Sequence, residues 1–185
     1  LYSGQVFGLT LPLVTKADGT KFGKTEAGTI WLDPAKTSPY AFYQFWRNTA
    51  DADVYKFLRY FTFLAISRIE AIEEEDKARQ GPPQGQAVLA EEVTRLVHGD
   101  EGLAAAQRIT TSLCSGSVAN LSESDLEQMA LDGLPASMLK AEDLSLPLTS
   151  LLSQVGMGAG KVIKDALGRN AVLVNGESKG VDDNM

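Results

Sequence analysis

The feature that most limits the fold of this 185-residue chain is a series of apolar side chains spaced at helical intervals after residue 38. Ser38 followed by Pro39 is a favoured helix start. The aromatic side chains that follow it share one helical face: Phe42, Phe45 and Trp46. A second run has the i, i+3, i+4, i+7 pattern of a helix with one buried face: Val54, Phe57, Leu58 and Phe61. The pattern therefore predicts a mainly α protein with a core of packed helices.

Further helices are predicted along the chain. Residues 67–70, Ser-Arg-Ile-Glu, have the pattern of a capping box and predict a third helix, which ends near Gly81-Pro82-Pro83. The next helix begins near Gln84 and aligns four side chains that we expect in the core: Leu89, Val93, Leu96 and Val97. A second limb begins at Gly102 and aligns Ile109 with Leu113. A short helix capped at Ser122 follows.

His98-Gly99 lies between two of these helical limbs. A glycine after a histidine is typical of a helix C-terminus, with Gly99 in a left-handed cap and the imidazole near the negative end of the helix dipole. No cysteine, serine or metal-ligand cluster accompanies His98, so we expect a structural role for it and no metal site. The single Cys114 excludes an internal disulfide, and we expect a small buried residue rather than a nucleophile.

The chain after residue 132 has a different pattern. Residues 133–147 show little periodicity and contain prolines, as is typical of a linker. Residues 148–152 and 159–167 predict two helices, and residues 171–176 predict a strand that ends in an Asn-Gly turn. Residues 156–160 are rich in glycine, but no predicted strand precedes them. We therefore interpret them as a flexible approach to a helix and not as a dinucleotide-binding loop.

The net charge of −7 is unevenly distributed. Residues 1–60 carry seven Lys/Arg against five Asp/Glu, whereas residues 61–146 carry six against fifteen. The acidic side chains between Glu70 and Asp76 suggest a solvated helix face. Charge therefore leaves RNA binding open without supporting it. No apolar stretch is long enough to span a membrane and no signal-peptide pattern begins the chain, so an intracellular protein is expected.

Lys21-Phe22-Gly23-Lys24-Thr25 is the candidate functional segment. Lysine is a compact charge on a flexible stem, so two lysines on a glycine-containing loop suit an anion whose charge grows during a reaction. The alternative is an exposed, lysine-bearing turn between two strands. A P-loop is excluded, because only three residues separate Gly19 from Gly23 and the β-branched and aromatic residues 29–34 do not open a helix.

Several stretches together resemble bacterial-type tyrosyl-tRNA synthetase: residues 7–20, Lys21 to Thr25, 31–34, 37–46, 48–54, 61–64 and 89–99. The resemblance covers nearly the whole chain and fades only between Gly133 and Leu146. Lys21 to Thr25 stand where class I synthetases carry the KMSKS motif. The His-x-Gly-His motif of that class cannot be present, because His98 is the only histidine. The resemblance therefore implies a C-terminal fragment of a longer enzyme, beginning at the last strand of the catalytic fold.

The resemblance also implies a domain organisation. Residues 1–37 would be the end of the catalytic domain with its KMSKS-like loop, and residues 38–132 a helical anticodon-binding domain. Residues 133–146 would be a linker, and residues 147–185 a partial S4-like α/β RNA-binding unit. In that unit Lys161 and Lys164 stand where the family usually has arginines that contact the tRNA backbone, and lysine lacks their bidentate fork.

For the activity, the resemblance implies attack of tyrosine on ATP, used with Mg2+, to form tyrosyl-adenylate, followed by transfer to tRNA(Tyr). Lys21 and Lys24 would neutralise charge on the departing pyrophosphate, Thr25 would add a hydroxyl donor, and Gly23 would let the loop close. The parent would be a homodimer, with this fragment monomeric and inactive alone. The bacterial cytoplasm is expected, with the mitochondrial matrix as the alternative. The competing function is a non-catalytic RNA-binding or scaffolding module derived from a synthetase.

Overall fold

Helix α1, Pro39–Arg47, begins where the sequence predicts. The computed structural model describes residues 6–25, 28–115, 118, 120–181 and 183. The Ser38 hydroxyl caps α1 by accepting a hydrogen bond of 3.0 Å from the Ala41 amide, and Pro39 occupies the first turn. Phe42 and Trp46 are buried on one face of the helix, as expected. The mainly α fold is confirmed for the described residues.

Helices α2, Asp51–Phe61, and α3, Ile66–Ala78, follow. The apolar face of α2 is buried through Val54, Phe57 and Leu58, as its spacing predicts. The capping box expected at Ser67 is wrong, because α3 begins one residue earlier and Ala65 is its N-cap. The Ala65 carbonyl accepts hydrogen bonds from the first turn of the helix, which places Ser67 inside that turn.

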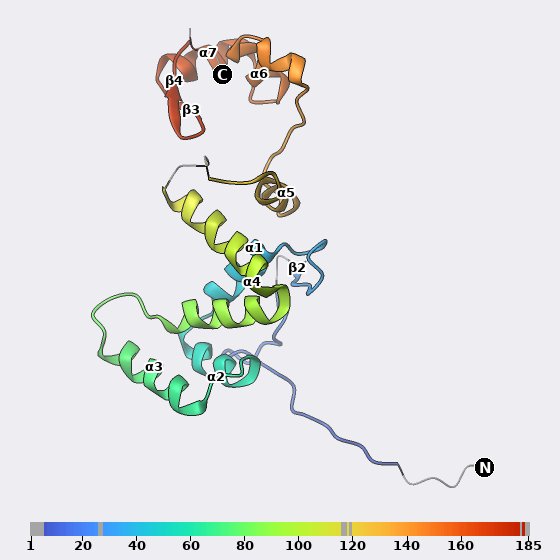
Figure 1. The fold of residues 1–185 in the computed structure, drawn as a ribbon, viewed down its shortest axis with the longest axis vertical. Coiled ribbons are helices and arrows are strands. Elements are labelled where there is room, and N and C mark those ends of the chain that lie inside the picture. The colour runs from blue at the N-terminus through green and yellow to red at the C-terminus, as the bar shows by residue number, and fades with distance from the viewer. Residues whose placement is uncertain (1–5, 26–27, 116–117, 119, 182, 184–185) are drawn as a thin grey trace, which may run out of the picture.

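Helix α4, Gly85–Ser115, contains the bend predicted at His98-Gly99. Gly99 has a φ of +71°, which interrupts the helical backbone and which a residue with a side chain rarely adopts. Helix α1 packs along α4, and α2 and α3 lie beside the first limb of α4 (Figure 1). These helices enclose the first core, which includes Phe42, Leu58 and Leu89.

Some side chains expected in this core are exposed. Leu96 and Leu113 of α4 are 56% and 45% exposed. Leu96 lines the wall of an open cavity together with Phe42 of α1 and is not enclosed by the core. Cys114 is also exposed, so the expectation of a buried cysteine is wrong. Asp76 does not belong to a solvated face, because its carboxylate accepts hydrogen bonds from Tyr55 Oη (2.8 Å), Gln84 N (2.7 Å) and Gly85 N (2.8 Å) and thereby caps α4.

Helix α5, Glu123–Leu131, has the predicted cap at Ser122, completed by a capping box with Asp125. An irregular stretch and the short 3-10 helix Ala141–Ser145 lead from α5 to helices α6, Leu148–Gln154, and α7, Gly160–Gly168. The hairpin of β3, Val172–Val174, and β4, Glu177–Lys179, follows and turns at Asn175-Gly176, both of which have positive φ. A second core joins α6, α7 and β3 through Leu148, Leu167 and Val172.

The strand expected at the beginning of the chain is not formed in the described residues 6–14. The first residues of this segment extend away from the helices without a paired strand (Figure 1), whereas Val14 packs against the first core. The apolar side chains before it are largely exposed: Val6, Phe7, Leu9, Leu11 and Leu13. A β-strand needs a hydrogen-bonded partner, and apolar residues alone do not create one. No described helix is long and apolar enough to cross a membrane.

Candidate functional site

The segment before the lysine-bearing loop is a closed turn. Thr15 and Lys21 form an antiparallel bridge, and within it Lys16 N donates to Thr20 O at 2.9 Å. Asp18 accepts hydrogen bonds from the Thr20 hydroxyl at 2.6 Å and from the Thr20 amide at 2.9 Å. These hydrogen bonds, the hydroxyl first, lower the pKa of Asp18. Gly19, at a φ of +82°, supplies the left-handed residue that the turn requires.

Phe22 fixes the loop to the helices. Its ring lies 4.7 Å from that of Phe57 and 5.2 Å from that of Phe61, measured between ring centroids. Phe45 and Trp46 of α1 complete this aromatic pocket, at 5.7 Å and 5.3 Å. Offset and edge-on ring pairs of this kind are favourable, so the aromatic cluster holds the loop as well as the core.

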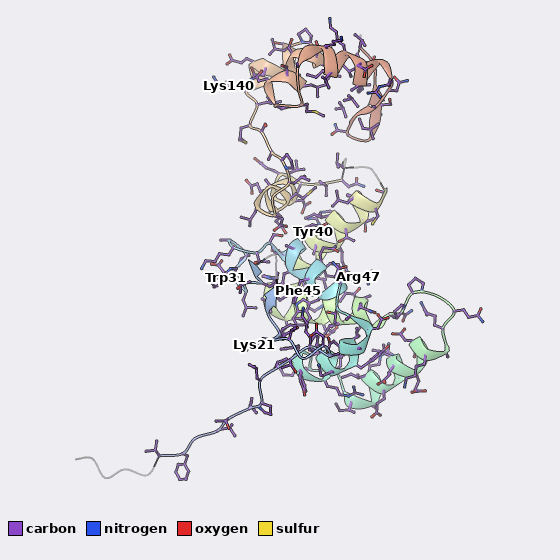
Figure 2. The ribbon with its side chains drawn as sticks, turned by 180° about the vertical axis from the view of Figure 1, so that it is seen from behind. Lys21, Trp31, Tyr40, Phe45, Arg47 and Lys140 are labelled. Atoms are coloured by element: carbon purple, nitrogen blue, oxygen red, sulfur yellow. The ribbon has the colours of Figure 1, made fainter. Side chains whose placement is uncertain are left out.

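Lys21 is exposed at the point where the extended segment meets the helices (Figure 2). Phe22, the next residue, packs against the aromatic rings of α1 and α2, whereas the Lys21 side chain stays in solvent. Gly23 has a φ of +83°, which bends the chain between the two lysines. A cationic side chain is therefore presented to solvent from an anchored backbone.

Lys24 and Thr25 form strand β1, Lys24–Thr25, which pairs with β2, Gly28–Thr29. The partners are Lys24 with Thr29 and Thr25 with Gly28, in antiparallel register. The predicted roles of the Lys24 and Thr25 side chains fall outside what the structure describes. No helix follows β2 until α1, which agrees with the exclusion of a P-loop.

Asp53 and Lys56 of α2 bind the backbone of the turn, an interaction that the sequence analysis did not predict. The Asp53 carboxylate accepts a hydrogen bond of 3.0 Å from Ala17 N and lies 2.7 Å from the Lys56 ammonium. The same ammonium donates to Thr15 O at 2.7 Å. Burial alone would raise the pKa of Asp53, but the hydrogen bonds from Lys56 and Ala17 outweigh it and lower the pKa.

A cavity of about 620 Å³ opens beside this turn, between the loop and helices α1 and α2. Its walls combine the Phe22, Phe45 and Phe57 rings with the polar Lys16 and Gln44 side chains. Mixed apolar and polar walls of this kind are typical of small-molecule sites. Lys21 is outside the lining, so this cavity and the exposed lysine are separate features of the same loop region.

The two C-terminal candidates, Lys161 and Lys164, are both exposed on α7. Ile163 and Leu167 of the same helix are buried in the second core. The helix therefore presents its lysines on the side away from the core. Among the described residues neither lysine forms an ion pair, so both charges are available to an external anion.

His98 has a structural environment. Its ring meets Phe42 edge-on at 4.8 Å, and its buried Nε2 has no hydrogen-bond partner among the described residues. Burial lowers the pKa of the imidazole, which favours the neutral form. Within the described part of the chain no group of three or more His, Cys, Asp or Glu side chains is arranged to hold a metal ion.

An anchored loop with an exposed lysine, followed by a helical core, agrees with the class of protein that the chain matches. The model of the class I tRNA synthetases (W and Y) matches residues 2–115, and the chain belongs to this family. Within the family its curated relatives are tyrosine–tRNA ligases. The enzyme named so in Aliivibrio fischeri strain MJ11 is 61% identical over 173 residues, which are 94% of this chain and 40% of that protein.

Another relative, tyrosine–tRNA ligase 1 of Vibrio parahaemolyticus, is 57% identical over 96% of this chain and 42% of its own length. The chain thus spans about two fifths of the relatives that it matches. A C-terminally truncated mitochondrial tyrosyl-tRNA synthetase of Aspergillus nidulans is similar in structure, with a TM-score of 0.44 and 36% identity over 48% of this chain and 25% of that one. The predicted resemblance to bacterial-type tyrosyl-tRNA synthetases is confirmed by the curated relatives.

Proposed function

We propose that this chain is part of a tyrosine–tRNA ligase that activates tyrosine with ATP and Mg2+ and transfers it to tRNA(Tyr). The observation that carries the proposal is the Lys21 to Thr25 loop, with Lys21 exposed and Phe22 anchored among four aromatic rings. Support also comes from the relatives that are named tyrosine–tRNA ligases at 57–61% identity.

In this proposal Lys21 and Lys24 act on the pyrophosphate that leaves when tyrosine attacks the α-phosphate of ATP. Negative charge grows on that group in the transition state, so a cation that reaches it then lowers the barrier more than it strengthens substrate binding. Gly23 lets the backbone bend between the two lysines, and Thr25 adds a hydroxyl donor.

In this proposal the chain has four regions, and those after residue 37 serve tRNA binding. Residues 1–37 belong with the catalytic domain, residues 38–132 form the anticodon-binding domain, residues 133–146 link it to the S4-like unit, and residues 147–185 form that unit. Lys161 and Lys164 neutralise backbone phosphates of the tRNA. The whole enzyme acts as a homodimer in the bacterial cytoplasm, and this chain alone is monomeric and inactive.

A chimera tests the proposal. The matching part of the Aliivibrio fischeri enzyme is replaced by this chain, and tyrosine-dependent ATP–pyrophosphate exchange and tRNA(Tyr) charging are measured. We expect both activities. Lys21→Ala and Lys24→Ala should each cost about 2–4 kcal/mol of transition-state stabilisation, roughly a 30- to 800-fold loss in the exchange rate, with the KM for tyrosine nearly unchanged.

Lys36→Ala is the matched control, because Lys36 is an exposed lysine that lies 4.4 Å from the Trp31 ring, outside the loop. It should leave the exchange rate unchanged. A folded chimera without exchange activity would overturn the proposal and favour a non-catalytic RNA-binding module. Full activity in both loop variants would overturn the role of the lysines.

A further inference from the structure

Asp53 is placed unusually for an acidic residue in the first turn of a helix. Such carboxylates are commonly exposed, where they favour the positive end of the helix dipole. Asp51, two residues earlier in the same turn of α2, is exposed in this way. Asp53 is only 3% exposed, and its carboxylate is covered by the turn that precedes the Lys21 loop.

The contacts of Asp53 join two segments that are far apart in the sequence. One carboxylate oxygen accepts the Ala17 amide at 3.0 Å, and the other lies 2.7 Å from the Lys56 ammonium. That ammonium also donates to Thr15 O at 2.7 Å, two residues before Ala17 on the same arm of the turn. The carboxylate and the ammonium therefore fix the arm of the turn that pairs with Lys21.

The pair combines a buried carboxylate with a lysine whose side chain is 32% exposed. Removing charges from water is costly, and a buried pair often contributes no more to stability than apolar side chains would. Here each partner also makes one hydrogen bond to the backbone of the turn. The Lys21 end of that turn is closed by the bridge between Thr15 and Lys21.

We infer that Asp53 and Lys56 are positioning residues that hold the backbone of Lys21 at a fixed place relative to α2 for pyrophosphate release. This inference rests on the function proposed above. Phe22 packs the loop against the helices, and the charged pair fixes the turn that precedes the loop. Neither Asp53 nor Lys56 touches substrate. Their effect is to keep the Lys21 ammonium within reach of a charge that exists only in the transition state.

Hydrogen–deuterium exchange on the 185-residue chain tests whether Asp53 and Lys56 hold the turn, and it needs no measurement of enzyme activity. Asp53→Asn should lower the protection of amides in residues 15–22 about tenfold while the core amides of Leu89 and Ala90 keep theirs. Asp51→Asn is the matched control on the same helical turn and should change neither. Unchanged protection of residues 15–22 in Asp53→Asn would overturn the inference.

Kinetics in the chimera test the consequence. Asp53→Asn and Lys56→Met should each lower the kcat of pyrophosphate exchange roughly 10-fold with the KM for tyrosine within about twofold, since a small misplacement of a catalytic group is costly. The double variant should lose little more kcat than either single variant, because both substitutions release the same turn. Lys56→Met also covers the case in which Asp53→Asn fails to fold, since the Lys56 side chain is 32% exposed.

The outcomes separate the inference from the proposed function. If Lys21→Ala slows exchange but Asp53→Asn and Lys56→Met do not, the positioning role is wrong and the clamp remains. If neither Lys21→Ala nor Lys24→Ala has an effect, the clamp itself is wrong. Equal losses in Asp51→Asn and Asp53→Asn, or additive losses in the double variant, would also overturn the positioning role.

Discussion

The ion pair between Asp125 and Arg108 provides a quantitative test of how α5 is held against α4. The Asp125 carboxylate is fully buried and accepts two hydrogen bonds from the guanidinium, at 2.8 Å from Nε and 2.7 Å from Nη2. It also accepts the Ser122 amide at 2.8 Å, which caps α5. One side chain thus connects the two helices and completes the start of the second.

The hydrogen bonds from Arg108, above all, hold the pKa of Asp125 at about 2, below its ordinary value of 3.8. Such a difference corresponds to about 2 kcal/mol of stability at neutral pH. The folded pKa lies below the unfolded one, so this contribution is complete above about pH 5, falls to about half near pH 3 and is almost lost at pH 2. Because the Arg108 side chain is 40% exposed, solvent screening makes this figure an upper estimate.

Urea unfolding of the unsubstituted 185-residue chain and of its Asp125→Asn variant measures this contribution. The fluorescence of the buried Trp46 follows the unfolding. The stability difference between the two should shrink by about 1 kcal/mol between pH 7 and pH 3. Glu92→Gln is the control, because Glu92 pairs with Arg95 at 2.7 Å on the surface of α4, where such pairs contribute little. A difference for Asp125→Asn that is equal at both pH values would refute the reasoning.

Four further outcomes are expected. Phe22→Ala should lower the stability measured by urea unfolding by about 2–4 kcal/mol, since it empties the centre of an aromatic cluster; a loss below about 1 kcal/mol would contradict this. Gly99→Ala should cost about 1–3 kcal/mol in thermal unfolding, because an alanine is strained at a φ of +71°, and an unchanged melting temperature would argue against it. Proton NMR of His98 should show a midpoint below the ordinary histidine value, and stability should fall as the pH drops through that range, because the unfolded chain binds the proton more readily; a raised midpoint would refute the burial argument. Joint replacement of Lys161 and Lys164 by alanine should weaken tRNA(Tyr) binding by the chimera and lower its salt dependence by roughly one to two phosphate contacts, whereas an unchanged salt slope would exclude these lysines from the interface.

Local chemistry made several elements predictable. Ser38 and Pro39 specify the start of α1 by themselves, because the cap and the fixed proline φ act within one turn. Asn175-Gly176 likewise specifies the hairpin turn, since both residues tolerate the positive φ that it needs. Gly99 interrupts α4 for the same local reason. The anchoring of the loop by Phe22 was not predicted, because it depends on rings supplied by two later helices.

Three features that the sequence did not indicate depend on what packs against a side chain from elsewhere in the chain. Asp76 has the sequence context of a solvated acidic helix. It caps α4 only because the Gln84 and Gly85 amides lie against its carboxylate in the fold. Leu96 has core spacing, but it lines an open cavity beside Phe42 and Phe61 and stays 56% exposed. The burial of Asp53 depends on Ala17, 36 residues earlier. Helical spacing gives the face of a side chain and not what packs against it.

The two lysines of the loop differ in what holds them, and this changes how each can respond to the rest of the molecule. Lys21 lies between the bridge to Thr15 and the anchored Phe22 ring, so its backbone belongs to the helical body built around α2. Lys24 lies beyond Gly23, in the short hairpin of β1 and β2. A displacement of α2 should therefore move Lys21 with it. In the proposed clamp Lys21 is thus the charge whose position depends on α2, so substitutions at Asp53 or Lys56 should act through Lys21 rather than through Lys24.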